Sequence, residues 1–341
     1  MDLTAAVLDT LLHGSTLTRS EATEVLGSVL RGDVDAALIA SLLTLLAQRG
    51  ETVEEMTGFV DAMLAACETV DIPSRAMDIV GTGGDRLHSV NVSTMAALTV
   101  AACGIPVAKH GNRAASSSVG TADVLEGAGV KIDIDGPTVA RCVREAGMGF
   151  FFAQRFHPGL RHLAPIRRAL GFPTAFNVLG PLANPGHVQH LLIGVANAAM
   201  MPKMAAVLLA RGVERATLLH SDDGLDELSL GSPATLVEVA DGTISTRRID
   251  AGQSLGIRHD VTAIRGGDRA TNVAVLHDFV AGKEGAVFDV VTANAALALC
   301  VADDALSLGD GFDTARAAVR NGDAARVLQK LIDVSNGTSS S

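Results

Sequence analysis

The chain has 341 residues, of which 48% are hydrophobic and 19% are charged, and its formal net charge is −11. This length and apolar content predict two domains or one large one around a sizeable core, and they exclude a disordered chain. The acidic balance argues against a protein that binds the nucleic-acid backbone, because that task needs clustered lysine and arginine. A phosphorylated small molecule, bound with a metal ion, is compatible with this charge.

Targeting signals and cysteine usage predict a cytoplasmic protein. An acidic Asp2 and the lack of a basic run before an apolar stretch argue against a secretory signal. Residues 169–202 carry no charged side chain, but glycines and prolines interrupt them, so we expect an interior hinge or site segment and no membrane span. The cysteines are Cys67, Cys103, Cys142 and Cys300. Their spacing fits no metal site, and we expect buried thiols in a reducing compartment.

The first part of the chain is predicted to be purely helical. Thr18 with Glu21, and Thr52 with Glu55, have the spacing of capping boxes that begin helices. Residues 34–46 are apolar on every side of the expected helix, which is more than one face can bury within a small bundle. This pattern favours a subunit interface. The alternative is a central helix that its own neighbours cover.

From about residue 76, short apolar runs alternate with helical patterns. This alternation is typical of βαβ units and predicts an α/β domain with a largely parallel sheet. The Asp241-Gly242 pair between two alternating segments predicts a local antiparallel hairpin, 236–239 with 243–249. The expected parallel strands are 78–80, 107–109, 149–153, 191–195 and 216–220.

A glycine-rich loop follows the first expected strand. In Gly81-Thr82-Gly83-Gly84-Asp85 the glycines allow positive φ and bring backbone N–H groups close to an anion. A helix from about Ser93 would direct its positive end toward the same place. These features indicate a phosphate site, and an ordinary strand-to-helix turn is the alternative.

Polar side chains also follow the second expected strand, where ligands collect in open α/β sheets. Lys109 could neutralise a phosphate, and Asn112 with the hydroxyls of Ser116, Ser117 and Ser118 could bind a sugar or further phosphate oxygens. The serines could instead simply begin the next helix.

Four carboxylates crowd one segment after the last expected parallel strand: Asp222, Asp223, Asp226 and Glu227. Such crowding occurs on solvated loops, which is one reading, or where a divalent cation binds, which is the other. Magnesium uses one or two carboxylates together with water and substrate phosphates, and Asp226 and Glu227 could supply them.

Three other side chains could bind or react, but each has a simpler explanation. His110 and His157 lie near glycine turns, where a packing or hydrogen-bonding role is more common than proton transfer, so neither is assigned an acid or base role. Arg167 precedes the uncharged segment and could grip a carboxylate, whereas a surface pair with Arg168 is the alternative.

Taken together, the motifs resemble those of the anthranilate phosphoribosyltransferase family, over nearly the whole chain. The resemblance rests on the glycine loop, on Asn91-Val92-Ser93-Thr94, on Lys109-His110-Gly111-Asn112-Arg113 and the serines before Gly120, on 176–185, and on Asp223-Gly224-Leu225-Asp226-Glu227. It implies Mg²⁺-dependent transfer of the phosphoribosyl group from 5-phosphoribosyl diphosphate (PRPP) to the amine of anthranilate in tryptophan biosynthesis, with release of pyrophosphate.

The resemblance also implies site residues. Anthranilate would contact Gly81, Asn112 and Arg167, with Arg167 on its carboxylate, and the metal would be held by Ser93, Asp226 and Glu227. The PRPP contacts would be Gly81, Gly83, Gly84, Asp85, Ser89, Asn91, Ser93, Thr94, Lys109, His110, Gly111, Asn112, Ser117 and Gly120. No general acid or base is implied.

The implied fold is a small all-helical N-terminal domain and a large α/β domain with a mainly parallel central sheet and flanking helices. We expect the helical domain at 1–70, completed by about 160–185, the α/β domain at 71–160 and 186–335, and a frayed tail at 336–341. The family usually forms homodimers through the helical part, and no nucleic-acid or membrane partner is implied.

Two positions depart from the commoner family pattern. Ser221 stands where glycine is usual, and Gly159 stands where alanine is more familiar, which puts the local loop geometry in doubt. Competing interpretations are a nucleic-acid-binding relative without the activity, a transferase for another aromatic amine, and a nucleoside phosphorylase. The acidic charge argues against the first, and the retained Asn112 and Arg167 argue against a changed acceptor.

Overall fold

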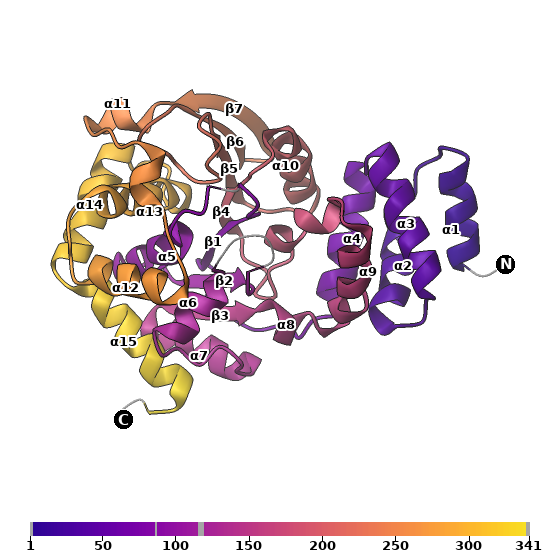
Figure 1. The fold of residues 1–341 in the computed structure, drawn as a ribbon, viewed down its shortest axis with the longest axis horizontal. Helices are drawn as coiled ribbons and strands as arrows, with labels where there is room; N and C mark the ends of the chain where they lie inside the picture. The colour runs from indigo at the N-terminus through magenta and orange to yellow at the C-terminus, as the bar shows by residue number, and fades with distance from the viewer. Residues whose placement is uncertain (1–2, 86, 115–118, 339–341) are drawn as a thin grey trace.

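The computed structural model describes residues 3–85, 87–114 and 119–338 and has two lobes (Figure 1). The small lobe is helical, and the large lobe is an α/β domain whose seven-stranded sheet is flanked by helices. The expected fold class is therefore confirmed. No helix in the described part of the chain is long and apolar enough to cross a membrane.

The helical lobe begins with four helices: α1 (Leu3–Leu12), α2 (Arg19–Arg31), α3 (Ala36–Arg49) and α4 (Val53–Ala65). Both predicted capping boxes are present, at the starts of α2 and α4. Two later elements pack against this lobe, since the 3-10 helix η1 (Pro158–His162) contacts α2 and α9 (Ala164–Leu170) contacts α3. The close approach of η1 requires Gly159, because a Cβ there would lie 2.7 Å from the Leu30 carbonyl oxygen.

The sheet has the order β3-β2-β1-β4-β5-β6-β7. Its first five strands are parallel, and β5, β6 and β7 pair antiparallel, so the predicted strands and hairpin are confirmed. The strands are β1 (Met77–Gly81), β2 (Val107–Gly111), β3 (Met148–Phe152), β4 (His190–Gly194), β5 (Arg215–Ser221), β6 (Ala234–Ala240) and β7 (Thr243–Ile249).

Helices connect and cover the strands (Figure 1). The α-helices of the large lobe are α5 (Val92–Ala102), α6 (Thr121–Gly127), α7 (Gly136–Ala146), α8 (Ala153–Phe156), α10 (Met201–Ala210), α11 (Ala251–Leu255), α12 (Arg269–Val280), α13 (Ala286–Ala302), α14 (Leu308–Arg320) and α15 (Asp323–Asn336). The remaining 3-10 turns are η2 (Ala175–Asn177), η3 (Gly180–Leu182), η4 (Ala198–Met200) and η5 (Val261–Ile264).

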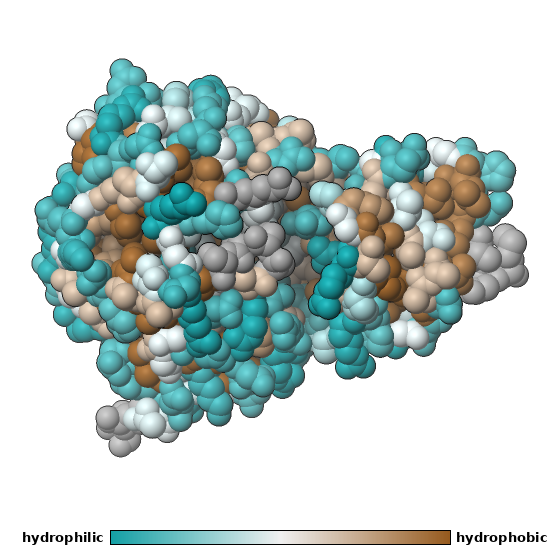
Figure 2. Space-filling view, in the orientation of Figure 1, coloured by the Kyte–Doolittle hydropathy of each residue, from teal (hydrophilic) through white to brown (hydrophobic). Residues whose placement is uncertain are grey.

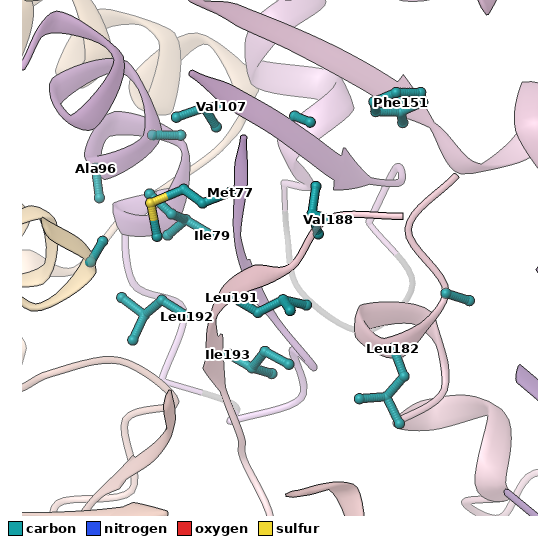
Figure 3. Packing of buried hydrophobic residues seen from close by; sticks show 14 of the residues in the cluster. Met77, Ile79, Ala96, Val107, Phe151, Leu182, Val188, Leu191, Leu192 and Ile193 are labelled. Atoms are coloured by element: carbon teal, nitrogen blue, oxygen red, sulfur yellow. The ribbon is translucent and has the colours of Figure 1, made fainter. Parts of the chain in front are cut away.

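The core of the large lobe forms where the parallel strands meet α5. Figure 3 shows Met77 and Ile79 of β1 beside Ala96 of α5 and Leu192 of β4, and all four side chains are buried. Apolar runs such as 190–194 are buried on both faces because helices cover both sides of a parallel sheet. This packing holds β1, β2, β4 and β5 side by side and parallel. Their carboxyl ends therefore lie along the same edge of the sheet.

The uncharged segment within 169–202 links the two lobes. Phe176 stacks on Phe59 of α4, with ring centroids 6.3 Å apart, while Asn184 donates a hydrogen bond to the Asp78 carboxylate of β1 at 2.8 Å. The segment is therefore held at one end by the helical lobe and at the other by the sheet.

Helix α3 buries only one face. Ile39, Leu42, Leu43 and Leu46 belong to the core, whereas Leu38 and Leu45 stay partly exposed. Figure 2 shows further hydrophobic residues on the surface of the helical lobe, and Leu12 of α1 is 69% exposed.

Two expectations need correction. Helix α15 continues through Asn336, whose side-chain amide donates to the Gly129 and Ile332 carbonyls, so the tail does not begin at residue 336. All four cysteines are free, but only Cys142 is buried, and the other three are partly exposed.

Candidate active site

The expected ligand-binding residues lie along the carboxyl edge of the sheet and on the loops beside it. They comprise Gly81, Gly83, Gly84 and Asp85 after β1, Ser89, Asn91, Ser93 and Thr94 around the start of α5, Lys109, His110, Gly111 and Asn112 at the end of β2, Gly120 before α6, and Asp226 and Glu227 after β5. Arg167 stands apart from this edge, on α9, and Ser117 lies outside the described residues, as do Ser116 and Ser118.

The loop after β5 turns its last two carboxylates inward. The backbone N–H of Gly83 donates to Asp226 Oδ2 at 3.0 Å, and the N–H of Ser93, in the first turn of α5, donates to Glu227 Oε1 at 2.9 Å. Only 8% of Asp226 is exposed. The solvated-loop alternative is therefore wrong for these two residues, although it holds for the exposed Asp222, which pairs with Arg248.

Burial and like charge make these carboxylates hard to ionise. Burial raises the pKa of Asp226 to about 7, and the neighbouring Asp85 adds to the shift. Burial likewise raises the pKa of Glu227 well above its ordinary value, with Asp226 as the second cause. A cation at this position would relieve both effects, because it favours the charged form of each carboxyl group.

The donor set fits magnesium. Asp85 Oδ2 and Glu227 Oε2 are buried and have no hydrogen-bond partner among the described residues. Oxygen donors of this kind suit Mg²⁺, which takes one or two carboxylates and completes its octahedron with water and substrate phosphates. Across the part of the chain that the structure describes, no three acidic, histidine or cysteine side chains form a complete metal cage. A bound phosphate would have to contribute ligands.

Lys109 lies behind this cluster. Its side chain is 1% exposed, and its ammonium donates to the Ile79 carbonyl of β1 and to Ser93 Oγ, the latter at 3.3 Å. Burial lowers its pKa to about 8, while Asp78 and Glu227 act in the opposite direction. The ammonium therefore places a positive charge beside Ser93, next to the anion-binding loop.

Ser221, one of the departures from the family pattern, braces the acidic loop. Its hydroxyl donates to the Glu227 carbonyl oxygen at 2.7 Å and accepts from the Ser229 N–H at 3.0 Å. The serine is fully buried. The hydroxyl thus makes two hydrogen bonds across the loop that carries Asp226 and Glu227.

A buried carboxylate that sequence reasoning missed, Asp78 of β1, joins β1 and β2 to the uncharged segment 169–202, the expected hinge segment. Asp78 Oδ1 accepts from the His110 N–H at 3.2 Å, and Oδ2 accepts from Asn184 Nδ2 at 2.8 Å. Burial raises the pKa of Asp78 to about 6, against the opposing charge of Lys109. The only sequence signal was an acidic residue within a strand that is otherwise apolar.

The two histidines fasten the same segment. His110 Nδ1 lies 3.2 Å from the Gly180 carbonyl oxygen, and His157 Nε2 lies 2.9 Å from that of Ala183. Burial lowers the pKa of His110 to about 3 and also lowers that of His157. The packing interpretation of both side chains therefore agrees with their contacts.

Arg167, on α9, contacts two residues of the hinge segment. Its guanidinium lies 5.7 Å from the centre of the Phe176 ring, and Nη2 donates to Asn177 Oδ1 at 3.3 Å. Burial lowers the pKa of Arg167, and no carboxylate among the described residues forms an ion pair with it. A half-buried arginine of this kind can bind a carboxylate ligand. Arg168 is exposed, whereas Arg167 is partly buried.

Comparisons with known proteins match both lobes. Residues 73–325 match the model of the "Glycosyl transferase family, a/b domain", and residues 5–67 match that of the "Glycosyl transferase family, helical bundle domain". The chain is 47% identical over 336 residues to an anthranilate phosphoribosyltransferase of Thermomicrobium roseum, and the match covers 97% of each chain.

Solved structures are similar over the same length. The crystal structure of the anthranilate phosphoribosyltransferase from Thermus thermophilus is 36% identical, with a TM-score of 0.91, and the match covers 98% of this chain and 100% of that one. The Saccharomyces cerevisiae enzyme in complex with PRPP and Mg is 26% identical, with a TM-score of 0.89 and 98% of each chain covered. The same yeast enzyme has also been solved with 4-fluoroanthranilate.

Proposed function

The chain belongs to the anthranilate phosphoribosyltransferase family, and from this premise we propose that PRPP and magnesium bind at the carboxyl edge of its sheet, with anthranilate between Asn112 and Arg167. The enzyme transfers the 5-phosphoribosyl group from PRPP to the amine of anthranilate, in tryptophan biosynthesis. The observation that carries the assignment of the site is the inward-facing Asp226 and Glu227 beside a glycine loop, with Glu227 Oε2 buried and without a hydrogen-bond partner among the described residues.

The donor would lie over the glycine loop and the start of α5. Gly83 and Gly84 have φ of +64° and +91°, a conformation that lets successive N–H groups face an anion. The first turn of α5 adds the positive end of a helix dipole at Ser93 and Thr94. Ser89, Asn91, Gly111 and Gly120 border the same edge and stay predicted PRPP contacts, as does His110, whose ring is turned toward Gly180.

Magnesium would be held by Asp226 and Glu227 with Ser93 beside them, and Asp85 supplies a further unpaired oxygen. The ion would neutralise charge on the pyrophosphate as the bond to the sugar breaks. Lys109, behind Ser93, adds a fixed positive charge on the same side. These are the groups that make pyrophosphate a better leaving group.

Anthranilate would be oriented by its carboxylate on Arg167 and by the amide of Asn112, near Gly81. Asn112 is exposed at the end of β2, and its Oδ1 accepts from the Arg113 N–H at 2.8 Å. Its side-chain N–H groups, for which the described residues offer no acceptor, would face the ligand. Phe176 and Asn177 hold the Arg167 guanidinium, so less rotational freedom is lost when the carboxylate binds.

In the reaction, the amine nitrogen forms a bond to C1 of the ribose while the C1–O bond breaks and its electron pair leaves with pyrophosphate. The amine then loses one proton. An aromatic amine is neutral near pH 7, so the site needs to hold the two reactants in line more than it needs a strong base. Closure of the helical lobe over both substrates would complete this alignment, with the segment around Phe176 and Asn184 as the hinge.

The assembly and location are proposals of the same kind. The partly exposed Leu38 and Leu45 of α3 and the exposed Leu12 of α1 support a homodimer through the helical lobe. The four free cysteines support a cytoplasmic location, since thiols stay reduced there.

The test of the proposed function is a fluorescence assay. The chain contains neither Trp nor Tyr, so its own emission interferes little with that of anthranilate. Loss of anthranilate fluorescence should require both PRPP and Mg²⁺ in the wild-type enzyme. The double variant Asp226→Asn, Glu227→Gln should lose at least about a hundredfold in kcat/KM, because the metal loses both of its carboxylates. Full Mg²⁺-dependent turnover by that variant would refute the metal assignment.

A further inference from the structure

The carboxylate of Asp123, in the first turn of α6, closes the loop that follows β2. Its Oδ2 accepts from the N–H of Ala114 at 3.1 Å and from the N–H of Gly120 at 3.0 Å. One oxygen therefore joins two backbone positions that are six residues apart in the chain. The second oxygen, Oδ1, accepts from Arg113 Nη1 at 3.0 Å.

The two ends of this loop, at Ala114 and Gly120, lie against each other. A Cβ on Gly120 would lie 2.4 Å from the Ala114 nitrogen and 2.7 Å from the Asn112 carbonyl oxygen, so only glycine allows the approach. The Ala122 N–H donates to that same Asn112 oxygen at 3.2 Å. The backbone of Asn112 is thus fixed by contacts with the segment that Asp123 holds.

Arg113 connects Asp123 to the rest of the lobe. Its guanidinium lies 5.5 Å from the centre of the Phe152 ring of β3, and it also makes two hydrogen bonds to Glu126, at 2.9 and 3.0 Å. Glu126 contacts Arg113 but neither of the loop N–H groups. The two acids therefore share one arginine, while Asp123 has the backbone bonds as well.

The charge of Asp123 is favourable where it stands. Partial burial acts to raise its pKa, but the bonds from Gly120, Ala114 and Arg113 outweigh this and hold the pKa below its ordinary value. The carboxylate is thus ionised at neutral pH and accepts all three hydrogen bonds, which are stronger than bonds to a neutral acceptor.

We propose that Asp123 is a positioning residue for substrate binding: by joining Ala114 to Gly120 and holding Arg113, it sets the place of Asn112 and of the Gly120 end of the loop. This inference rests on the proposed function, in which Asn112 contacts anthranilate and Gly120 borders PRPP. Asp123 does not itself touch either substrate. Loss of the Asp123 carboxylate displaces Asn112. A small displacement of such a contact residue weakens substrate binding in an aligned site.

Three variants of the full-length enzyme test the proposal. Asp123→Ala removes all three bonds, Asp123→Asn keeps one oxygen for the two backbone N–H groups, and Glu126→Gln is the matched control at the other partner of Arg113. We expect Asp123→Ala to raise KM for anthranilate by about tenfold or more, with a smaller rise for PRPP. Asp123→Asn should show a smaller, severalfold rise, because it keeps the two backbone bonds but loses the bond from Arg113. Glu126→Gln should stay close to wild type.

Thermal midpoints measured in parallel separate positioning from simple destabilisation. A lower midpoint with wild-type KM values in Asp123→Ala would overturn the proposal. An equal KM rise in Glu126→Gln would also overturn it, because the ion pair with Arg113 would then be the cause. Should Asp123→Ala fail to fold, a severalfold KM rise in Asp123→Asn against unchanged Glu126→Gln supports the proposal, and equal values in the two refute it. Inactive wild-type enzyme would instead contradict the proposed function.

Discussion

At the residue scale, the uncharged His110 side chain connects β2 to the hinge segment beside the site. It is 4% exposed and bonds the Gly180 carbonyl of the hinge segment. Because burial lowers its pKa to about 3, the folded protein keeps it neutral over the whole physiological range. An unfolded chain takes up a proton on this histidine below a pH of about 6.5.

The sign of the resulting pH dependence follows from these values. Between a pH of about 6.5 and about 3 the unfolded state binds the extra proton, so the contribution of His110 to stability is present above this window and is lost as the pH falls. We predict that the stability advantage of wild type over His110→Asn shrinks by about 2 kcal/mol between pH 7 and pH 5. Urea unfolding at both pH values measures it. His13→Asn, at an exposed histidine, is the control, and parallel curves for wild type and His110→Asn would contradict the prediction.

At the scale of elements, the site depends on how closely the loop after β5 approaches β1 and β4. Gly81 and Gly194 are register partners at the ends of these two strands. A Cβ on Gly194 would lie 1.6 Å from the Asp226 carbonyl oxygen, and one on Gly81 would lie 2.9 Å from Asp226 Oδ2. Two facing glycines therefore make the room in which Asp226 meets the glycine loop.

We accordingly predict that Gly194→Ala displaces Asp226 and lowers Mg²⁺-dependent kcat/KM by about a hundredfold, because a shift of about 1 Å in an aligned site has this effect. The variant should also lose about 1–3 kcal/mol of stability through overpacking. Enzyme kinetics across a Mg²⁺ titration and thermal unfolding measure the two effects. Gly309→Ala, on α14 and free of close contacts, should be unchanged in activity. Wild-type Mg²⁺ dependence in Gly194→Ala would show that the loop tolerates the shift.

At the scale of the whole molecule, the exposed apolar residues of the helical lobe bear on how the chain assembles. The helical lobe exposes 69% of Leu12, and α3 beside α1 leaves Leu38 and Leu45 partly uncovered. Figure 2 places hydrophobic residues over the surface of this lobe. Apolar residues gathered in this way are typical of a surface that another subunit covers.

If the dimer forms there, Leu12→Glu should weaken it at least about tenfold, because a charge without a partner is unfavourable in an apolar interface. Light scattering coupled to size exclusion, run over a range of protein concentrations, measures the change in mass. Ile244→Glu, at a similarly apolar exposed position on β7, should leave the mass unchanged. A wild-type protein that is monomeric throughout would refute the dimer itself.

The elements were predictable because their signals are local. Capping boxes at Thr18 and Thr52, the Asp241-Gly242 turn and the short apolar runs each depend on a few neighbouring residues. The end of α15 was not predictable in this way, since polar Ser335 and Asn336 become helical through bonds to residues near 130, far away in sequence.

The sequence by itself determined the fold class, the family and the types of side chain available to bind phosphate, metal and carboxylate. Only the tertiary structure decided that Asp226 and Glu227 face inward while Asp222 faces solvent, that Lys109 lies behind Ser93, and that Asp123 closes a loop. The reason is physical. A carboxylate's environment depends on which strand ends lie beside it, and the pairing of β1 with β4, which sets Met77 against His190, joins segments that are far apart in the chain.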